Sequence, residues 1–293
     1  MRKTLLCQIA NASTTQMMSY VIRTTDKKTI VIDGGTVRDA DRLFDRLKSI
    51  TGSEKPHIDG WFLTHAHSDH IDALMELLSR GGLFTLDALY YHFPSVQFVE
   101  KNEPGEAHTL ARFYALLPLV AAQANVVSSG DSYNIGAARF DVLYTADPAF
   151  TMNAVNNTST VLRMTASGQT VLFLGDLGKE AGKKLLREHG SGLQSDFCQM
   201  AHHGQNGVDF PVYKAVRPRA CLWCTPDWLW NNDAGKGYNT HIWKTIEVRK
   251  WMDRLNVNTH FVCKDGDHRI MLPYSFDGAA SQARPSAPRR PRA

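Results

Sequence analysis

Short apolar runs and longer amphipathic stretches follow one another along most of this 293-residue chain. Apolar residues recur at helical spacing within residues 37–50, where Leu43, Leu47 and Ile50 form one stripe, and this predicts a helix. Strands are predicted at residues 4–12, 16–24, 29–32, 58–63, 140–144, 160–164, 170–174, 220–224, 259–263 and 269–272, with another ending at Ala201. Further helices are predicted at residues 71–78, 110–124, 179–189 and around 243–255.

The order of these elements predicts the fold class. Strands arrive in two sets with helices between them, which indicates an α/β protein of two packed sheets with helices outside. The strands at residues 259–263 and 269–272 are expected to pair with each other. Residues 1–277 are predicted to form one domain, and residues 278–293, rich in Ala, Pro, Ser and Arg, a disordered tail.

Charge and cysteine content narrow the class of protein. The formal net charge is +4, and four arginines within that tail account for it, so the body of the chain is balanced and lacks a strong basic signal for nucleic acid. Five cysteines, an odd number, argue against a disulfide framework and predict a cytoplasmic protein. No apolar run approaches the ~18 residues of a membrane span. The oligomeric state is left open.

The strongest chemical signal is the segment His65-Ala66-His67-Ser68-Asp69-His70, which directly follows a predicted buried strand. Three of the twelve histidines fall here beside an acid, so four candidate ligands project from one loop at the end of a sheet. Imidazoles with a carboxylate suit zinc, and also manganese or iron where carboxylates contribute more. The sequence therefore predicts a site for one or two metal ions, zinc first.

Two further segments also place candidate metal ligands at the end of an apolar strand. The apolar strand at residues 170–174 ends in Gly175-Asp176, and His202-His203-Gly204 follows a later apolar strand. A carboxylate can bridge two cations, and the histidines would complete the cluster. Asp33, at the end of a strand before Gly34-Gly35, is either an acid that orients a ligand histidine or simply a turn residue.

In this order, the three motifs resemble those of the metallo-β-lactamase superfamily over roughly residues 15–275. The stretch from Asn156-Asn157-Thr158-Ser159-Thr160 into the next strand is most similar to the nuclease-like domain of DNA-uptake competence proteins. The resemblance implies an αββα sandwich of two mixed sheets with the active site at one edge.

The resemblance also implies a role for each motif residue. His65 and His67 would hold a first metal, Asp69 and His70 a second, and Asp176 would bridge them. Of the adjacent pair, His203 is preferred as the last ligand of the second site. His202 would then face the substrate as a hydrogen-bond donor or general acid, so that Asp69 and His202 are the expected catalytic residues.

One position departs from the pattern of the superfamily, where many members carry a histidine just before the strand that here begins near Thr160. This chain has Asn156 and Asn157 there, which are expected to contact substrate or to cap the loop. The first site would then be open, weakly occupied, or completed by another residue such as His92 or His108. His241, in a loop rich in Trp, Asn and Gly, is a further candidate for substrate contact.

These features predict a hydrolase, because a cation lowers the pKa of its bound water from ~16 towards ~7 and so supplies hydroxide at neutral pH. Two cations suit a phosphodiesterase or nuclease that acts on a small or single-stranded phosphoester. The alternatives are hydrolysis of a carboxylic ester, lactone or amide, because one scaffold hosts many reactions, and a non-catalytic binding protein that keeps a structural metal.

Overall fold

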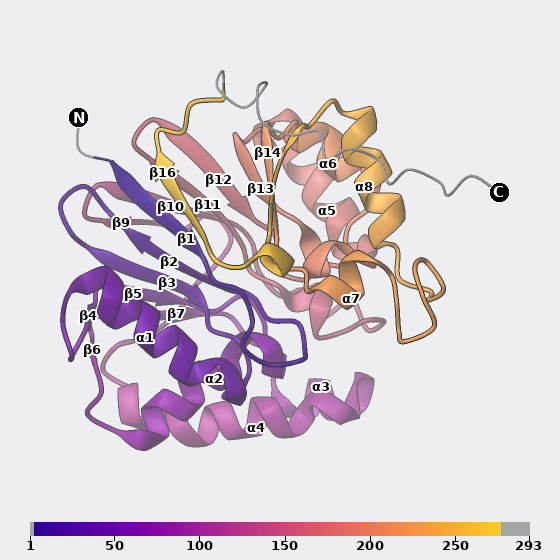
Figure 1. Ribbon diagram of the computed structural model, residues 1–293. Coiled ribbons are helices and arrows are strands. Elements are labelled where there is room, and N and C mark those ends of the chain that lie inside the picture. The colour runs from indigo at the N-terminus through magenta and orange to yellow at the C-terminus, as the bar shows by residue number, and fades with distance from the viewer. Residues whose placement is uncertain (1–2, 277–293) are drawn as a thin grey trace.

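Apolar residues occupy both faces of the central strands, so each of these strands is buried on two sides. In β1 (Thr4–Gln8), Leu5 and Cys7 pack in one core and Leu6 packs in another. Such nearly continuous hydrophobicity is typical of sheets covered on both faces. The computed structural model describes residues 3–276, and the chain packs in four layers, helices, sheet, sheet and helices (Figure 1).

The first sheet has seven strands in the order β16-β1-β2-β3-β5-β7-β8. Besides β1 these are β2 (Ser19–Arg23), β3 (Thr29–Asp33), β5 (Gly60–Phe62), β7 (Leu89–Tyr91), β8 (Ala124–Val126) and β16 (His268–Leu272). Pairing is antiparallel from β16 to β3 and parallel from β3 to β8. The short strands β4 (His57–Ile58) and β6 (Thr85–Leu86) pair beside it.

The second sheet also has seven strands, in the order β15-β14-β13-β12-β11-β10-β9. These are β9 (Ser132–Ile135), β10 (Ala138–Tyr144), β11 (Val161–Ala166), β12 (Gln169–Phe173), β13 (Phe197–Gln199), β14 (Ala220–Trp223) and β15 (Thr259–Val262). The strands from β12 to β15 are parallel, so the chain leaves them at one edge of the sheet.

Helices cover the outer face of each sheet. The first sheet carries α1 (Ala40–Thr51), α2 (Ser68–Arg80), α3 (Val96–Asn102) and α4 (Ala107–Leu116), and the second carries α5 (Lys179–His189), α6 (Phe210–Val216), α7 (Asp227–Trp230) and α8 (Thr245–Arg254). Short 3₁₀ turns lie at Val37–Asp39, Pro104–Glu106, Leu117–Val120, Asn156–Thr158, Gly190–Leu193, Ala201–Gly204 and Cys263–Asp265.

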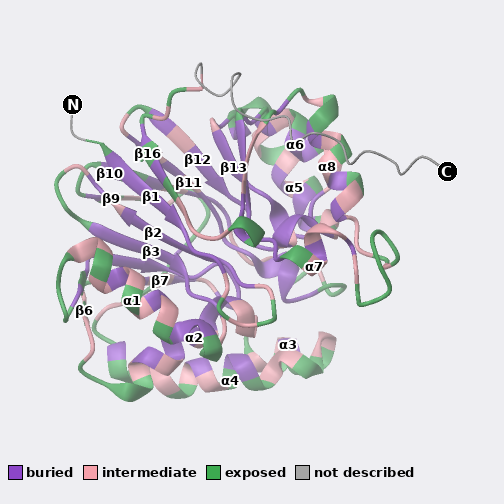
Figure 2. Cartoon of the chain, viewed as in Figure 1, coloured by how far each residue is buried: buried purple, intermediate pink, exposed green. Residues whose placement is uncertain are grey.

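Three apolar layers hold these elements together, one between the sheets and one under each group of helices. Figure 2 shows the strands buried along most of their length, whereas the helices alternate buried and exposed residues. Cys221 faces the α5–α8 side and Cys224 the space between the sheets, as strand alternation requires. The predicted pair of packed sheets with outer helices is confirmed.

Two sequence predictions about elements were wrong. The strands near residues 259–263 and 269–272 do not pair, because β15 is an edge of the second sheet whereas β16 joins β1 in the first. The helix expected over 110–124 ends at Leu116, and a 3₁₀ turn containing Pro118 leads to β8. The expected tail, 278–293, lies outside the described residues. Within residues 3–276 no helix combines the length and apolar character needed to cross a membrane.

Asp267, just before β16, contacts residues from the N-terminal part of the chain. Its carboxylate accepts hydrogen bonds from the Ala10 backbone N–H at 2.9 Å, from Arg42 at 2.7 Å and from Arg46 at 2.5 Å. Partial burial raises the pKa of Asp267, but the two guanidinium groups and the backbone donor lower it below its usual value. This acid therefore links α1 to the junction of β1 and β16.

We predict that Asp267→Asn lowers the free energy of unfolding by about 1 kcal/mol at neutral pH, since the arginines are partly exposed and screened. Because the folded-state pKa is depressed, the stabilisation is present above the unfolded-state value of about 3.9 and is lost as pH falls through the folded-state value. Urea unfolding near pH 7 and near pH 3 tests this, and an equal difference from wild type at both pH values would contradict it.

Candidate metal centre

Three loops deliver histidines and acids to one edge of the sandwich. The segment from His65 to His70 follows β5, Asp176 follows β12, and His203 follows β13, so each side chain is placed by the end of a buried strand. His65, His70, Asp176 and His203 are all buried. The edge predicted from three separate sequence motifs is therefore a single site.

Asp176 lies at the centre of this group. Its Oδ1 is 3.3 Å from His70 Nε2, and its Oδ2 is 3.3 Å from His203 Nε2. The same Oδ2 is 3.9 Å from both His65 Nε2 and His202 Nε2. One carboxylate thus faces imidazoles from the two other loops, which is the arrangement that a bridging ligand needs.

The donor atoms form two overlapping sets. His65, His70 and Asp176 make one set, and Asp69, His70 and His203 make the other, with donor atoms within 4.8 Å of one another in each. Asp69 Oδ2 is 3.1 Å from His203 Nε2. His67 presents its Nδ1 3.0 Å from His65 Nε2, so these two nitrogens point towards the same space.

Hydrogen bonds from behind fix the orientation of two imidazoles. Asp33 Oδ2 accepts from His70 Nδ1 at 2.7 Å, and the Cys224 carbonyl accepts from His203 Nδ1 at 2.9 Å. Each bond leaves Nε2 free to face Asp176. Asp33 is itself held by the Thr64 N–H and hydroxyl, both at 2.7 Å. Asp33 therefore occupies a position from which it orients a histidine.

Several buried atoms at the centre make no hydrogen bond to any residue in the described part of the chain. These atoms are His70 Nε2, His203 Nε2, Asp69 Oδ2 and Asp176 Oδ1. Buried polar groups without partners are costly in free energy, and a metal ion satisfies imidazole nitrogens and carboxylate oxygens together. The donor set therefore fits divalent cations.

Asp176, His70 and His203 shift one another's pKa values: the pKa of the acid falls and the pKa values of the two imidazoles rise. Burial raises the pKa of Asp176, but His203 and His70 lower it well below its usual value. Burial lowers the pKa of His203, yet Asp176 and Asp69 raise it to about 10, and the same acids raise the pKa of His70 well above its usual value. Protons and metal ions therefore compete for these imidazoles.

The backbone around His203 explains why glycine follows the histidine pair. His202 and His203 have φ of 51° and 53°, and Gly204 has φ of 80°. A Cβ at Gly204 would lie 2.4 Å from the Trp223 ring. This left-handed turn sends His203 inward, 3.1 Å from Asp69, whereas His202 lies farther out. Of the pair that the sequence left open, His203 is the better-placed ligand.

A cavity of about 460 Å³ opens beside the cluster. His67, Asp69, Asp176, His202 and Asn156 contribute to its wall. The rest of the wall consists of Thr15, Gln16, Thr36, Ser68, Glu103, Glu106 and Trp228. One candidate ligand of each set, Asp176 and Asp69, thus borders a space that can hold a small substrate.

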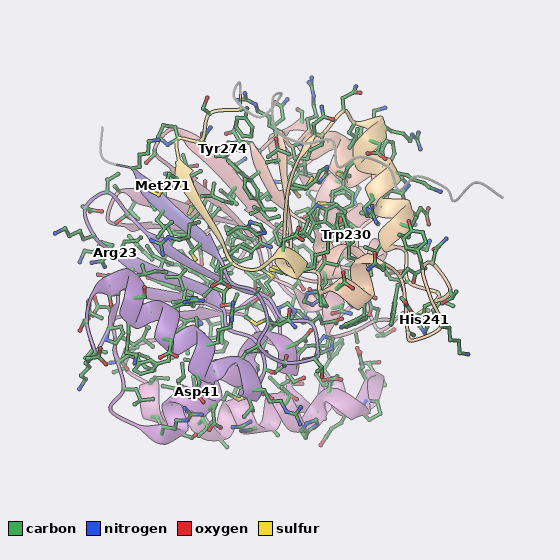
Figure 3. All side chains as sticks on the ribbon, in the orientation of Figure 1. Arg23, Asp41, Trp230, His241, Met271 and Tyr274 are labelled. Carbon is green, nitrogen blue, oxygen red and sulfur yellow. The ribbon has the colours of Figure 1, made fainter. Side chains whose placement is uncertain are left out.

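Two predicted substrate contacts lie away from this cavity. Asn157 is buried, and its side-chain nitrogen donates to the Met152 carbonyl at 2.9 Å and to Glu180 at 3.1 Å, so it holds the loop against α5. His241 stacks on Trp243 at 3.8 Å between ring centroids, and Trp243 in turn packs on Trp228 of the cavity wall. Figure 3 shows His241 on the loop that follows α7.

Glu103, which follows α3, is a site residue that the sequence did not indicate. Its Oε1 is 3.7 Å from His67 Nε2, and its Oε2 accepts a hydrogen bond from the Val155 N–H at 2.9 Å. His92 and His108, the suggested replacements for a missing ligand, do not border the cavity, and His92 instead bonds the Val127 carbonyl. In the sequence, Glu103 belongs to no recognisable ligand motif.

The first histidine motif lies in a segment that is similar to a known family. Residues 14–83 match the sequence model of the metallo-beta-lactamase superfamily. The match includes the segment from His65 to His70. No curated protein sequence matches it. The narrower likeness to competence proteins stays a prediction.

Two solved structures resemble the superfamily fold seen here. The metallo-beta-lactamase fold protein YhfI from Bacillus subtilis has a TM-score of 0.54 and 14% identity, over 91% of this chain and 99% of YhfI. CmlA, a diiron beta-hydroxylase from Streptomyces venezuelae, has a TM-score of 0.54 and 13% identity, over 93% of this chain and 55% of CmlA. This chain thus spans about half the length of CmlA. The predicted metallo-β-lactamase αββα fold is confirmed.

We predict that Asp33→Ala lowers the free energy of unfolding of the metal-free protein by about 3 kcal/mol. The change leaves the Thr64 N–H without its acceptor and puts alanine at a φ of 54°. Asp33→Asn, which keeps one oxygen and tolerates that φ, should cost less. Urea unfolding in the presence of a chelator measures both. Asp41→Ala, at an exposed position of α1, is the control, and an equal loss in Asp33→Ala and in the control would contradict the prediction.

Proposed function

We propose that this protein is a hydrolase that uses one or two divalent metal ions, held around Asp176, to activate water. The observation that supports it is the convergence of four imidazoles and two carboxylates at the border of a cavity. His65 and His67 would hold the first ion, and Asp69, His70 and His203 the second. Asp176 would bridge the two positions.

Metal ions in such a site would acidify a water molecule and neutralise negative charge on the oxygens of the substrate. The residues of the chain perform the remaining tasks. Asp33 and the Cys224 carbonyl hold the imidazoles in orientation. His202, which borders the cavity 3.9 Å from Asp176, would donate a hydrogen bond to the substrate, and Asp69 would hold its metal beside the reacting atoms.

Zinc is the metal that we propose first, because imidazole predominates among the ligands. Carboxylates supply the rest of the set, and iron and manganese also accept such mixed ligands. CmlA, whose fold is similar, is a diiron protein. The native metal is therefore one of the quantities that the experiment below must measure.

A small phosphodiester is the substrate class that we propose, since two cations can hold the attacking and leaving oxygens together. The described residues that line the cavity include neither lysine nor arginine. A nucleic acid strand is held mainly by basic contacts to its phosphates, so the small phosphodiester is favoured over a nuclease substrate. The five cysteines are all free, which supports a cytoplasmic location.

The test combines metal analysis with turnover. Protein purified without chelator should contain roughly one to two equivalents of zinc, manganese or iron, and should hydrolyse bis-p-nitrophenyl phosphate. Asp176→Asn should lower kcat/KM by a factor of about 10³, because the shared ligand of both ions is weakened. Asp265→Asn, which replaces an exposed acid paired with Lys264, is the matched control and should retain activity.

Each outcome has a defined meaning. Protein without bound metal, or full activity in Asp176→Asn, would overturn the proposed hydrolase. Turnover of lactones, carboxylic esters or β-lactams in place of phosphodiesters would keep the hydrolase and overturn the substrate class. Tightly bound metal without turnover of any of these compounds would favour a non-catalytic binding protein.

A further inference from the structure

The two proposed metal positions differ in the number of ligands that the chain supplies. Asp69, His70 and His203 surround the second position, in addition to the shared Asp176. The first position has only His65 and His67 besides that shared carboxylate. The first position therefore lacks one protein ligand relative to the second.

Asn156 supplies a free oxygen beside these groups. The residue is only 3% exposed, precedes β11, and borders the same cavity as His67 and Asp176. Its Nδ2 donates to Asn153 Oδ1 at 2.8 Å. Its Oδ1 makes no hydrogen bond to any described residue. A buried carbonyl oxygen without a donor is available to a ligand.

Glu103 contacts both the loop that carries Asn156 and the side chain of His67. Its Oε2 accepts from the N–H of Val155, the neighbour of Asn156, at 2.9 Å. Its Oε1 faces His67 Nε2 at 3.7 Å. Because His67 turns Nδ1 towards His65, Nε2 is the nitrogen directed away from the metal position. Glu103 thus lies on the side of His67 away from the metal position, as Asp33 does for His70, but at 3.7 Å in place of a 2.7 Å hydrogen bond.

We propose that Asn156 Oδ1 is the third protein ligand of the first metal position, and that Glu103 positions both His67 and the Asn156 loop. The inference rests on the proposed metal centre. An amide oxygen is a harder and weaker ligand than imidazole. The first ion therefore exchanges more readily than the second, and the first position accepts Mn²⁺ or Fe²⁺ more readily than a three-histidine site does.

Metal affinity, measured for each ion by equilibrium dialysis against graded chelator with elemental analysis, tests the ligand. Asn156→Leu, which keeps the size of the side chain without the oxygen, should weaken one ion at least tenfold and leave the other unchanged. Asn156→His should instead make that ion bind zinc more tightly. Asn134→Leu, at an exposed position of β9, is the control and should change neither affinity.

A second variant, Asp69→Asn, identifies which of the two ions depends on Asn156. Asp69→Asn should weaken the second position alone and so keep one ion, and Asp69→Asn combined with Asn156→Leu should lose both. Circular dichroism melting of the metal-free variants verifies that each one folds. If Asn156→Leu retains both ions at wild-type affinity, the inference fails and the hydrolase proposal stands. If the wild-type protein binds no metal, the proposed function itself fails.

Glu103→Gln tests the positioning role separately. The substitution can keep the acceptor for Val155 but removes the negative charge that faces His67, so the first ion should bind about 10- to 100-fold more weakly. Glu103→Asp should recover part of this loss, because it restores the charge. Glu100→Gln, exposed on α3, is the matched control. Unchanged affinity in Glu103→Gln would show that Glu103 does not position His67.

Discussion

The carboxylate of Asp176 is buried where the loops from both sheets meet, and its charge has to be compensated there. Burying an isolated carboxylate is far more costly than burying one that has partners of opposite charge. Asp176 is surrounded by His65, His70 and His203 within 4 Å. These three histidines therefore compensate the charge of the buried Asp176 carboxylate.

This arrangement of histidines around Asp176 depends on sharp turns at the ends of strands. Asp33, Gly175, His202 and His203 all have left-handed backbone conformations, and all follow or end strands at this edge. A Cβ at Gly175 would lie 3.0 Å from both Ser159 and Thr64, so the strand ends are packed closely as well as turned. Such conformations cost free energy and persist where the surrounding structure holds them, which is typical of functional sites.

Different contacts orient the histidines of the first and second proposed metal positions. The second position is held by two fully buried histidines that are oriented by Asp33 and the Cys224 carbonyl. The first position includes His67, which is partly exposed, and is braced from α3 by Glu103. Both positions border the cavity, the first through His67 and Asn156 and the second through Asp69.

The sequence alone determined the fold class and most of the candidate metal ligands, because His65 to His70, Asp176 and His203 stand at the ends of clearly apolar strands. Hydrophobic periodicity is local, and so it can be read along the chain. The structure alone decided that β15 and β16 belong to different sheets, that Asn157 packs inward, and that Glu103 reaches His67. These facts depend on contacts between residues distant in sequence, and local pattern carries no information about such contacts.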